Sequence, residues 1–234
     1  MSLPVAILAG GTATRLRPLT ESIPKALVDV AGKPFAEYQL ELLKRNGFKR
    51  IVFCVGYLGE KVEAALGNGD RWDMELSYVF DGEVLLGTGG ALRKALPLLG
   101  EKFLVLYGDT YLDCDYAAVE AAFLSGGKLG LMTVFRNNNQ WDRSNVFFVN
   151  GRVMRYDKRR PGPEMQHIDY GLGALQAKVF EDYPDDSVID LAQIYQDLLA
   201  RGELAGFEVT QRFYEIGTPS GLEETRRYLK EGIL

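Results

Sequence analysis

A short glycine-rich segment near the N-terminus carries residues that suit a phosphate chain. Residues 7–20 read ILAGGTATRLRPLT, so an apolar run leads into Gly10 and Gly11, and Arg15 follows. Glycines let backbone N–H groups turn toward an anion, and the planar guanidinium of arginine suits bidentate contact with phosphate oxygens. Lys25, in the segment PKAL, adds a second positive charge. The alternative is an ordinary turn with solvated basic residues, which a glycine pair alone would favour.

A second candidate is a carboxylate that follows an apolar run. Asp109 stands just beyond this run in the segment LVLYGDTYLDCD. A carboxylate at a strand end can hold Mg²⁺ together with substrate phosphates, although a turn or a helix cap explains a lone aspartate equally well. Asp113 and Asp115 form a D-x-D pattern. This pair is either a loop feature or the metal-binding pair of a metal-dependent glycosyltransferase.

Three further segments place single residues where they could bind a ligand. Gly87 and Thr88 precede a helical stretch, and such a segment either lies flat against a base or ribose or simply begins the helix. Lys158 opens a basic cluster whose plainer explanation is a solvated charge run. Glu215 lies between a strand and a helix, where the helix dipole also stabilises an acid. His167, the only histidine, is expected to be structural or part of a substrate wall.

These segments follow predicted strands in a front half that alternates strands with helices. Strands are predicted at 5–10, 50–57, 74–80, 102–109 and 128–135, and helices at 35–48, 58–69, 89–100 and 116–127. This alternation indicates βαβ units, a mostly parallel sheet and ligand binding beyond the carboxyl ends of its strands. Continuous apolar strands such as FLVLY suit a sheet that is covered on both faces.

The pattern changes after about residue 136. Residues 144–158 hold two strand-like runs around Asn150-Gly151, a combination typical of a type I′ hairpin. A strand at 167–177, a helix at 188–202 preceded by Asp185 and Asp186, and a strand, turn and helix at 212–232 complete the chain. We expect one domain over residues 1–234, with a nucleotide-binding front half and a smaller α/β back half.

Composition narrows the classes of function. The 234 residues carry a formal net charge of −5, which argues against a nucleic-acid partner but allows a local basic pocket. No apolar run reaches the roughly 18 residues of a membrane span, and no signal peptide is evident, so we expect no membrane partner. Two distant cysteines and one histidine do not form a common zinc site. A reducing cytoplasm is the simplest expectation; the oligomeric state stays open, and a homo-oligomer is compatible with the sequence.

Together, the glycine loop, the lysine and the strand-end aspartate resemble the sugar-1-phosphate nucleotidylyltransferases. The family pattern L-A-G-G/A-x-G-T-R-L-x-P-L-T, followed by P-K-x-L, stands here as LAGGTATRLRPLT and PKAL, with Ala13 in place of the third glycine. The likeness continues through LGTGGAL, YGDTYLD, YDK and YEIGTPSG, and so spans nearly the whole chain. The short length and HIDYGLGAL are most similar to compact bacterial members, the heptose-1-phosphate guanylyltransferases and the N-acetylmuramate-1-phosphate uridylyltransferases.

The resemblance implies a fold and a reaction. The fold would be a Rossmann-like three-layer α/β sandwich of the nucleotide-diphospho-sugar transferase type. The reaction would join an NTP and a sugar 1-phosphate, with Mg²⁺ as cofactor, into an NDP-sugar and pyrophosphate. Residues 1–136 would then bind the nucleotide and residues 137–234 the sugar phosphate. A weakly catalytic module that senses a nucleotide or sugar phosphate stays open beside this interpretation.

The resemblance also implies residue roles. Arg15, Lys25 and Asp109 would be catalytic, and Asp109 and Glu215 would hold the metal, with glutamate standing where the family usually has aspartate. Asp157 occupies the acidic position that usually accompanies Lys158. Nucleotide binding would fall to Gly10, Gly11, Arg15, Gly87 and Thr88, and sugar-phosphate binding to Lys158, Asp169, Tyr170 and Gly171.

Overall fold

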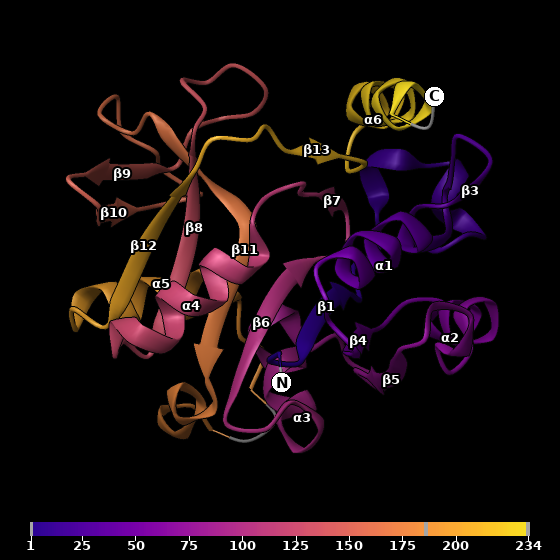
Figure 1. The fold of residues 1–234 in the computed structure, drawn as a ribbon, viewed down its shortest axis with the longest axis horizontal. Helices are drawn as coiled ribbons and strands as arrows, with labels where there is room; N and C mark the ends of the chain where they lie inside the picture. The colour runs from indigo at the N-terminus through magenta and orange to yellow at the C-terminus, as the bar shows by residue number, and fades with distance from the viewer. Residues whose placement is uncertain (1, 185–186, 233–234) are drawn as a thin grey trace.

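A nine-stranded mixed sheet forms the centre of the computed structural model, which describes residues 2–184 and 187–232 (Figure 1). The main path of the sheet runs β10-β9-β11-β6-β1-β4-β5, with β8 pairing to β11 and β12 pairing to β8. The strands are β1 (Val5–Ala9), β4 (Arg50–Val55), β5 (Glu75–Phe80), β6 (Lys102–Tyr107), β8 (Gly130–Arg136), β9 (Val146–Val149), β10 (Arg152–Tyr156), β11 (His167–Gln176) and β12 (Leu204–Val209). The expected α/β class with a mostly parallel front half is confirmed.

Strand β1 fixes the geometry of the front half. It pairs in parallel with β4 on one side and β6 on the other, so that Ile7 lies level with Phe53 and Leu106. Strand β5 continues the parallel set beyond β4. The carboxyl ends of β1, β4, β5 and β6 therefore share one edge of the sheet, where open α/β sheets bind ligands.

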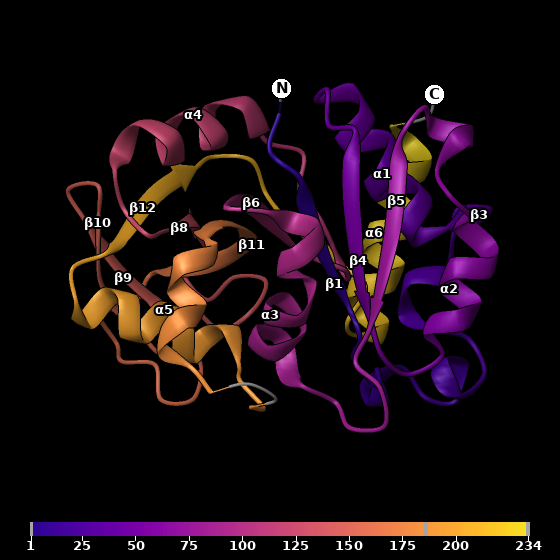
Figure 2. The same ribbon diagram turned by 90° about the horizontal axis from the view of Figure 1, so that it is seen from below.

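Helices cover both faces of the sheet and produce three layers (Figure 2). One face carries α1 (Phe35–Arg45), α2 (Gly59–Leu66), α4 (Tyr116–Gly126) and α6 (Pro219–Glu231), and the other carries α3 (Gly87–Leu99) and α5 (Leu191–Ala200). Strand β6 shows why its sequence is apolar throughout: Leu104 and Leu106 enter one core, while Phe103 and Val105 enter the other. Burial on both faces is thereby confirmed.

The back half adds antiparallel strands to the parallel set. Strands β9 and β10 form the expected hairpin, and Asn150 and Gly151 both have positive φ, as a type I′ turn requires. Strand β11 runs antiparallel to β6 and β8, and its register with β8 shifts between Asp169 and Gly173. Within this irregularity Gly171 has φ +98°, a conformation that favours glycine.

Several elements differ from the expectations. Strand β12 is not predicted from the sequence, yet it pairs in parallel with β8 along its whole length. Asp190 caps α5, since its side chain accepts the Ala192 N–H; Asp185 and Asp186 lie outside the described residues. Three short strands were not expected: β2 (Asp29–Val30), β3 (Lys33–Pro34) and β7 (Thr110–Tyr111). Strand β13 (Tyr214–Glu215) lies within the strand, turn and helix that the sequence predicts at 212–232. None of the helices in the described part of the chain is long and apolar enough to cross a membrane.

Candidate active site

A cavity of about 350 Å³ opens at the shared carboxyl edge of the parallel strands. It gathers residues that lie far apart in the sequence. Among the described residues that line it are Gly10, Gly11, Lys25, Asp81, Gly87, Thr88, Tyr107, Asp109 and Lys158. Most of the predicted site residues therefore lie around one space.

Three glycines follow directly after the central strands and bring their backbones close together. A Cβ atom on Gly56, after β4, would lie 2.7 Å from the carbonyl oxygen of Gly10. A Cβ atom on Gly108, after β6, would lie 2.6 Å from the carbonyl oxygen of Leu8. Real Cβ atoms essentially never come this close, so the strand ends meet as bare backbone, and Gly10 and Gly108 line the cavity.

The loop after β1 has one strained position and one open position. Ala13 has φ 49° and ψ 39°, the left-handed conformation that favours glycine. Its carbonyl oxygen accepts the Leu16 N–H at 3.1 Å and the Thr20 hydroxyl at 2.7 Å, and these bonds hold the turn. Within residues 2–184 and 187–232, no atom other than those of Gly11 and its chain neighbours lies within 4 Å of a Cβ built on Gly11, so a ligand meets open space there.

The Lys25 and Asp109 side chains meet at the cavity. Lys25 Nζ lies 2.9 Å from Asp109 Oδ2, and the two side chains are 19% and 32% exposed. Gln39, which was not predicted from the sequence, holds the turn that contains Asp109. The buried Gln39 of α1 donates through Nε2 to the carbonyl oxygens of Tyr107 and Thr110, at 2.9 and 2.8 Å.

Arg15 stands outside the described lining of this cavity, but its side chain approaches the same region. A Cβ on Gly217 would lie 3.4 Å from an Arg15 guanidinium nitrogen, 3.4 Å from Asp109 Oδ2 and 2.7 Å from Glu215 Oε2. Three charged groups from distant parts of the chain thus surround Gly217. The Ile216 N–H donates to the carbonyl oxygen of Asp109 at 2.9 Å, which joins the two segments.

Glu215 also organises the beginning of α6. Its Oε2 accepts the Gly217 N–H, and its Oε1 accepts the Thr218 hydroxyl at 2.6 Å. The Thr218 hydroxyl in turn accepts the Gly221 N–H at 3.0 Å. The plainer explanation, an acid at a helix N-terminus, therefore describes part of what Glu215 does. Each carboxylate oxygen has two lone pairs, so Oε2 retains one beside Asp109.

The donor groups suit a cation that also binds a ligand. In residues 2–184 and 187–232, no three His, Cys, Asp or Glu side chains are grouped as a complete protein site for a metal. Mg²⁺ needs fewer protein ligands, because it is usually held by one or two carboxylates together with substrate phosphates and water. Asp109, partly exposed at the cavity, fits that requirement.

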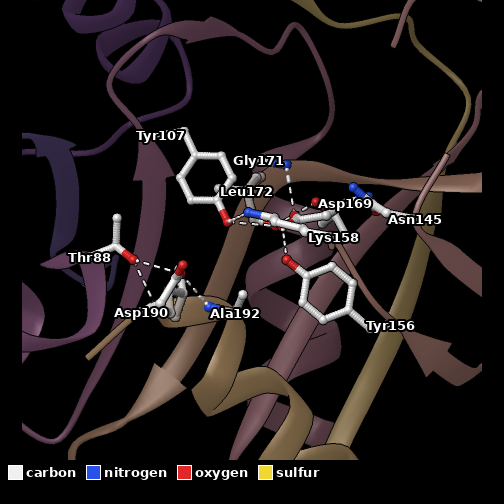
Figure 3. A network of polar contacts seen from close by, with 12 residues as sticks. Thr88, Tyr107, Asn145, Tyr156, Lys158, Asp169, Gly171, Leu172, Asp190 and Ala192 are labelled. Atoms are coloured by element: carbon white, nitrogen blue, oxygen red, sulfur yellow. Dashed lines mark hydrogen bonds and ion pairs between the residues drawn. The ribbon is translucent and has the colours of Figure 1, made fainter. Parts of the chain in front are cut away.

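Lys158 contacts the Tyr107 phenol and the Asp169 carboxylate, to which a second phenol, Tyr156, also donates (Figure 3). Its Nζ donates to Tyr107 Oη at 3.0 Å and lies 3.5 Å from Asp169 Oδ2. The hydroxyls of Tyr107 and Tyr156 both donate to that same Oδ2, at 2.9 and 3.1 Å. Burial, and then the charge of Asp169, raise the pKa of both tyrosines, so both remain neutral donors. Neither tyrosine was among the residues predicted from the sequence.

The other two predicted sugar-phosphate residues lie behind this network. Tyr170 is 1% exposed, and its ring packs near Phe135 and Phe213, away from the cavity. Gly171 supplies backbone: its N–H donates to Asp169 Oδ1 at 3.2 Å, and a Cβ there would lie 3.1 Å from the Tyr107 ring. Gly171 therefore allows β11 to approach Tyr107 closely.

Gly87 and Thr88 line the cavity and also join α3 to the segment before α5. A Cβ on Gly87 would lie 2.5 Å from the carbonyl oxygen of Ile189, and Gly87 has φ +74°. The Thr88 hydroxyl accepts the Leu191 N–H at 2.7 Å and donates to Asp190 at 3.2 Å. Packing at the helix start thus explains the glycine at this position, independently of any ligand.

Asp81 is a cavity residue that the sequence analysis missed. It follows β5 at the same edge, is 8% exposed, and lies near Gly10 and Gly56. Burial raises the pKa of its carboxyl group, against the lowering effects of the Leu86 N–H and the Lys94 charge. Its position just after a strand was the available signal, because Asp109 likewise follows a strand, β6, after one glycine.

The remaining candidates lie elsewhere. Asp115 caps α4 by accepting the Ala118 N–H, and Asp113 lines a separate depression between α1 and α6, so the D-x-D pair does not converge on the cavity. The Asp157 carboxylate accepts hydrogen bonds from the backbone N–H groups of Arg159 and Arg160. The bond from Arg160, and then the bond from Arg159, help to lower the pKa of Asp157. His167 contacts Glu208 at 3.1 Å on the sheet.

Comparisons with known proteins agree with this geometry. Residues 5–144 match the family described as nucleotidyl transferase. The chain is 31% identical to N-acetylmuramate alpha-1-phosphate uridylyltransferase of Neisseria meningitidis serogroup B, over 94% of this chain and 95% of the relative. It is 26% identical to D-glycero-alpha-D-manno-heptose 1-phosphate guanylyltransferase of Campylobacter jejuni, over 91% and 94% of the two chains. The structure of HddC from Yersinia pseudotuberculosis complexed with GMP-PN superposes with a TM-score of 0.80 at 28% identity, over 98% of this chain and 100% of that one.

Proposed function

The chain belongs to the nucleotidyl transferase family, and we propose that it is a sugar-1-phosphate nucleotidylyltransferase. A phosphate oxygen of the sugar 1-phosphate attacks the α-phosphorus of an NTP. The bond from that phosphorus to the oxygen bridging the α- and β-phosphates breaks, and pyrophosphate leaves as the NDP-sugar forms. The observation that carries the proposal is that Gly10, Lys25, Asp109 and Lys158 line one cavity although they lie far apart in the sequence.

The front half is proposed to bind the nucleotide. Gly10 and Gly11 leave backbone and free space for the phosphates, and Arg15 reaches toward the same region from the loop. Gly87 and Thr88 also line the cavity, and we assign their part of it to the base and ribose. The attacking oxygen is already anionic at neutral pH, so the reaction needs positioning and charge neutralisation rather than a strong general base.

Asp109, with Glu215 beside it, is proposed to hold Mg²⁺. Asp109 lines the cavity. Its Oδ2 and the Oε2 of Glu215 lie 3.4 and 2.7 Å from the position of a Cβ built on Gly217. When bound, Mg²⁺ would neutralise negative charge on the phosphates. Lys25 shares Asp109 Oδ2 at 2.9 Å and brings its own positive charge to the same phosphates.

The back half is proposed to bind the sugar 1-phosphate. Lys158 enters the cavity from the segment after β10 and supplies a positive charge for the phosphate group. Asp169 and Gly171 support that lysine from behind rather than facing the cavity themselves. The relatives named above use different bases and different sugars, so the proposal extends to the reaction class and not to one substrate pair.

The test is pyrophosphate release from a panel of NTPs and sugar 1-phosphates, with Arg15→Ala and Asp109→Ala as variants. We expect turnover for at least one pair and a loss of about 10²-fold or more in each variant, the size that charge-stabilising groups typically contribute. Unchanged turnover in Asp109→Ala would remove the metal assignment. NTP binding without turnover across the panel would favour a sensing module instead.

A further inference from the structure

Tyr107 occupies a central place that the reaction described above does not use. It ends β6, lines the cavity, and its hydroxyl lies between Lys158 and Asp169 (Figure 3). We propose that Tyr107 is a positioning residue that holds the Lys158 ammonium group where the sugar phosphate binds. This inference rests on the proposed function and adds a residue to it.

Lys158 needs such support because its backbone belongs to no helix or strand that would restrain its side chain. It lies in an irregular segment just after β10, next to Arg159 and Arg160, and its side chain is 38% exposed. A free lysine side chain samples many rotamers, and ordering it costs conformational entropy. A contact that already restrains the amine in the ligand-free protein removes part of that cost from binding.

The Tyr107 hydroxyl is suited to this role because it both donates and accepts a hydrogen bond. It donates its proton to Asp169 at 2.9 Å, and its oxygen accepts from Lys158 at 3.0 Å. The Lys158 ammonium also lies 4.8 Å from the Tyr107 ring centre, within cation–π range.

Asp169 explains why the arrangement is stable without a ligand. Its side chain is only 4% exposed, and a buried carboxylate is costly unless it is paired and hydrogen-bonded. Two tyrosine hydroxyls, the Gly171 N–H and the Lys158 ammonium group surround it. The buried Asp169 carboxylate therefore attracts the Lys158 ammonium group, and the hydrogen bond to Tyr107 fixes the position of that group.

Tyr156 provides a matched control for Tyr107. Both phenols donate to Asp169 Oδ2, at 3.1 Å for Tyr156 and 2.9 Å for Tyr107. Only Tyr107 among the described residues accepts a hydrogen bond from Lys158, and the Tyr156 ring centre is farther from the amine, at 5.9 Å. Tyr107→Phe and Tyr156→Phe thus each remove one bond to Asp169, but only the first removes the contact with Lys158.

The first measurement is steady-state kinetics with the substrate pair found in the panel. We expect Tyr107→Phe to raise KM for the sugar 1-phosphate about tenfold, as loss of a hydrogen bond to a charged group would, while KM for the NTP stays within about twofold. Tyr156→Phe should change both values by less than about threefold. In a Lys158→Ala background, Tyr107→Phe should add no further loss, because the two residues act through one contact. Equal effects of the two Phe variants, or a rise in KM for the NTP, would overturn the proposal.

The second measurement does not need turnover, so it separates this inference from the proposed function. Acetic anhydride labelling at pH 8, read by peptide mass spectrometry, compares Lys158 with the exposed Lys230 of α6 in each protein. Because the amine loses its nearest acceptor, the labelling ratio of Lys158 to Lys230 should rise about severalfold in Tyr107→Phe and stay constant in Tyr156→Phe. An unchanged ratio in Tyr107→Phe would contradict the positioning role even if pyrophosphate release is observed.

Discussion

Ala13 is the residue where the chain departs from the glycine of the family pattern, and its backbone shows the consequence. It holds the left-handed conformation (φ 49°), which costs a residue with a Cβ roughly 1 kcal/mol or more. Ala13→Gly should therefore raise the free energy of unfolding by about 1 kcal/mol, measured by urea denaturation.

A second alanine supplies the control for this prediction. Ala64 is exposed within α2, where glycine should instead lower the free energy of unfolding by about 1 kcal/mol. Opposite signs at the two positions would confirm that the backbone conformation, and not glycine in general, is responsible. A loss of stability in Ala13→Gly would show that the loop does not need the left-handed turn.

Asp81 gives the stability of the fold a definite pH dependence. Burial raises the pKa of its carboxyl group in the folded state, so its contribution to stability is fully present below the unfolded pKa and is lost as pH rises through the folded pKa. Asp81→Asn should therefore raise the melting temperature by about a few degrees at pH 7.5, with the gain shrinking to nothing near pH 4. Thermal unfolding of both proteins across that range measures the difference.

Asp73 offers a control of opposite sign. Its contacts with Lys49 lower the pKa of an exposed carboxyl group. The stability that this carboxylate adds is present above its unfolded pKa and is lost as pH falls through the folded pKa. Asp73→Asn should then be slightly less stable than wild type at pH 7.5.

For Asp81→Asn, a loss of stability that does not depend on pH would mean that the hydrogen bond from the Leu86 N–H outweighs the burial of the Asp81 charge.

At the scale of elements, the sequence predicts best where a period is long and regular. The strands and helices of the front half could be predicted because their apolar residues recur at helical spacing or fill whole strands. Strand β12, with the sequence LAGFEV, was not predicted because glycine interrupts its apolar residues. The structure gives the reason for that glycine: a Cβ on Gly206 would lie 2.6 Å from the Phe148 ring. That contact depends on tertiary packing, which the local pattern does not contain.

The same distinction separates the parts of the candidate site. Gly10, Lys25 and Asp109 could be predicted because each lies in or directly after a segment with a clear strand-end or loop signature. Tyr107 could not, because its partner Asp169 belongs to β11, and only the register of β11 with β6 brings the two together. Gln39 was missed for a similar reason, since its contacts with Tyr107 and Thr110 cross from α1 to the strand end.

The start of α6 links an element to the site. Thr218 caps this helix and also donates to Glu215, so Thr218→Ala should lower the free energy of unfolding by about 1 kcal/mol. Ser220→Ala, in the exposed first turn of the same helix, should change it by less than about 0.5 kcal/mol. Urea denaturation of the two variants gives the comparison, and equal losses would show that Thr218 does not act as the cap.

At the scale of the whole molecule, one sheet joins both halves and the cavity lies between them. Strand β6 pairs with β1 of the front half and with β11 of the back half, and the cavity is lined from both, by Lys25 and Lys158. A ligand that contacts both halves therefore stabilises the folded chain as a unit. At about one hundred times its Kd, it would add about 2.7 kcal/mol, which corresponds to a rise of several degrees in melting temperature for a chain of this size.

This coupling makes the metal assignment testable without turnover. We expect an NTP with Mg²⁺ to raise the melting temperature of wild type by several degrees more than the NTP with EDTA, because Asp109 and the phosphates would share the cation. Asp109→Asn should lose this Mg²⁺-dependent increment and keep the smaller shift caused by the NTP alone. Asp113→Asn, in the depression between α1 and α6, should keep both. If the increment persisted in Asp109→Asn and vanished in Asp113→Asn, the cation would bind at the D-x-D segment, and the strand-end cavity would no longer be the metal site.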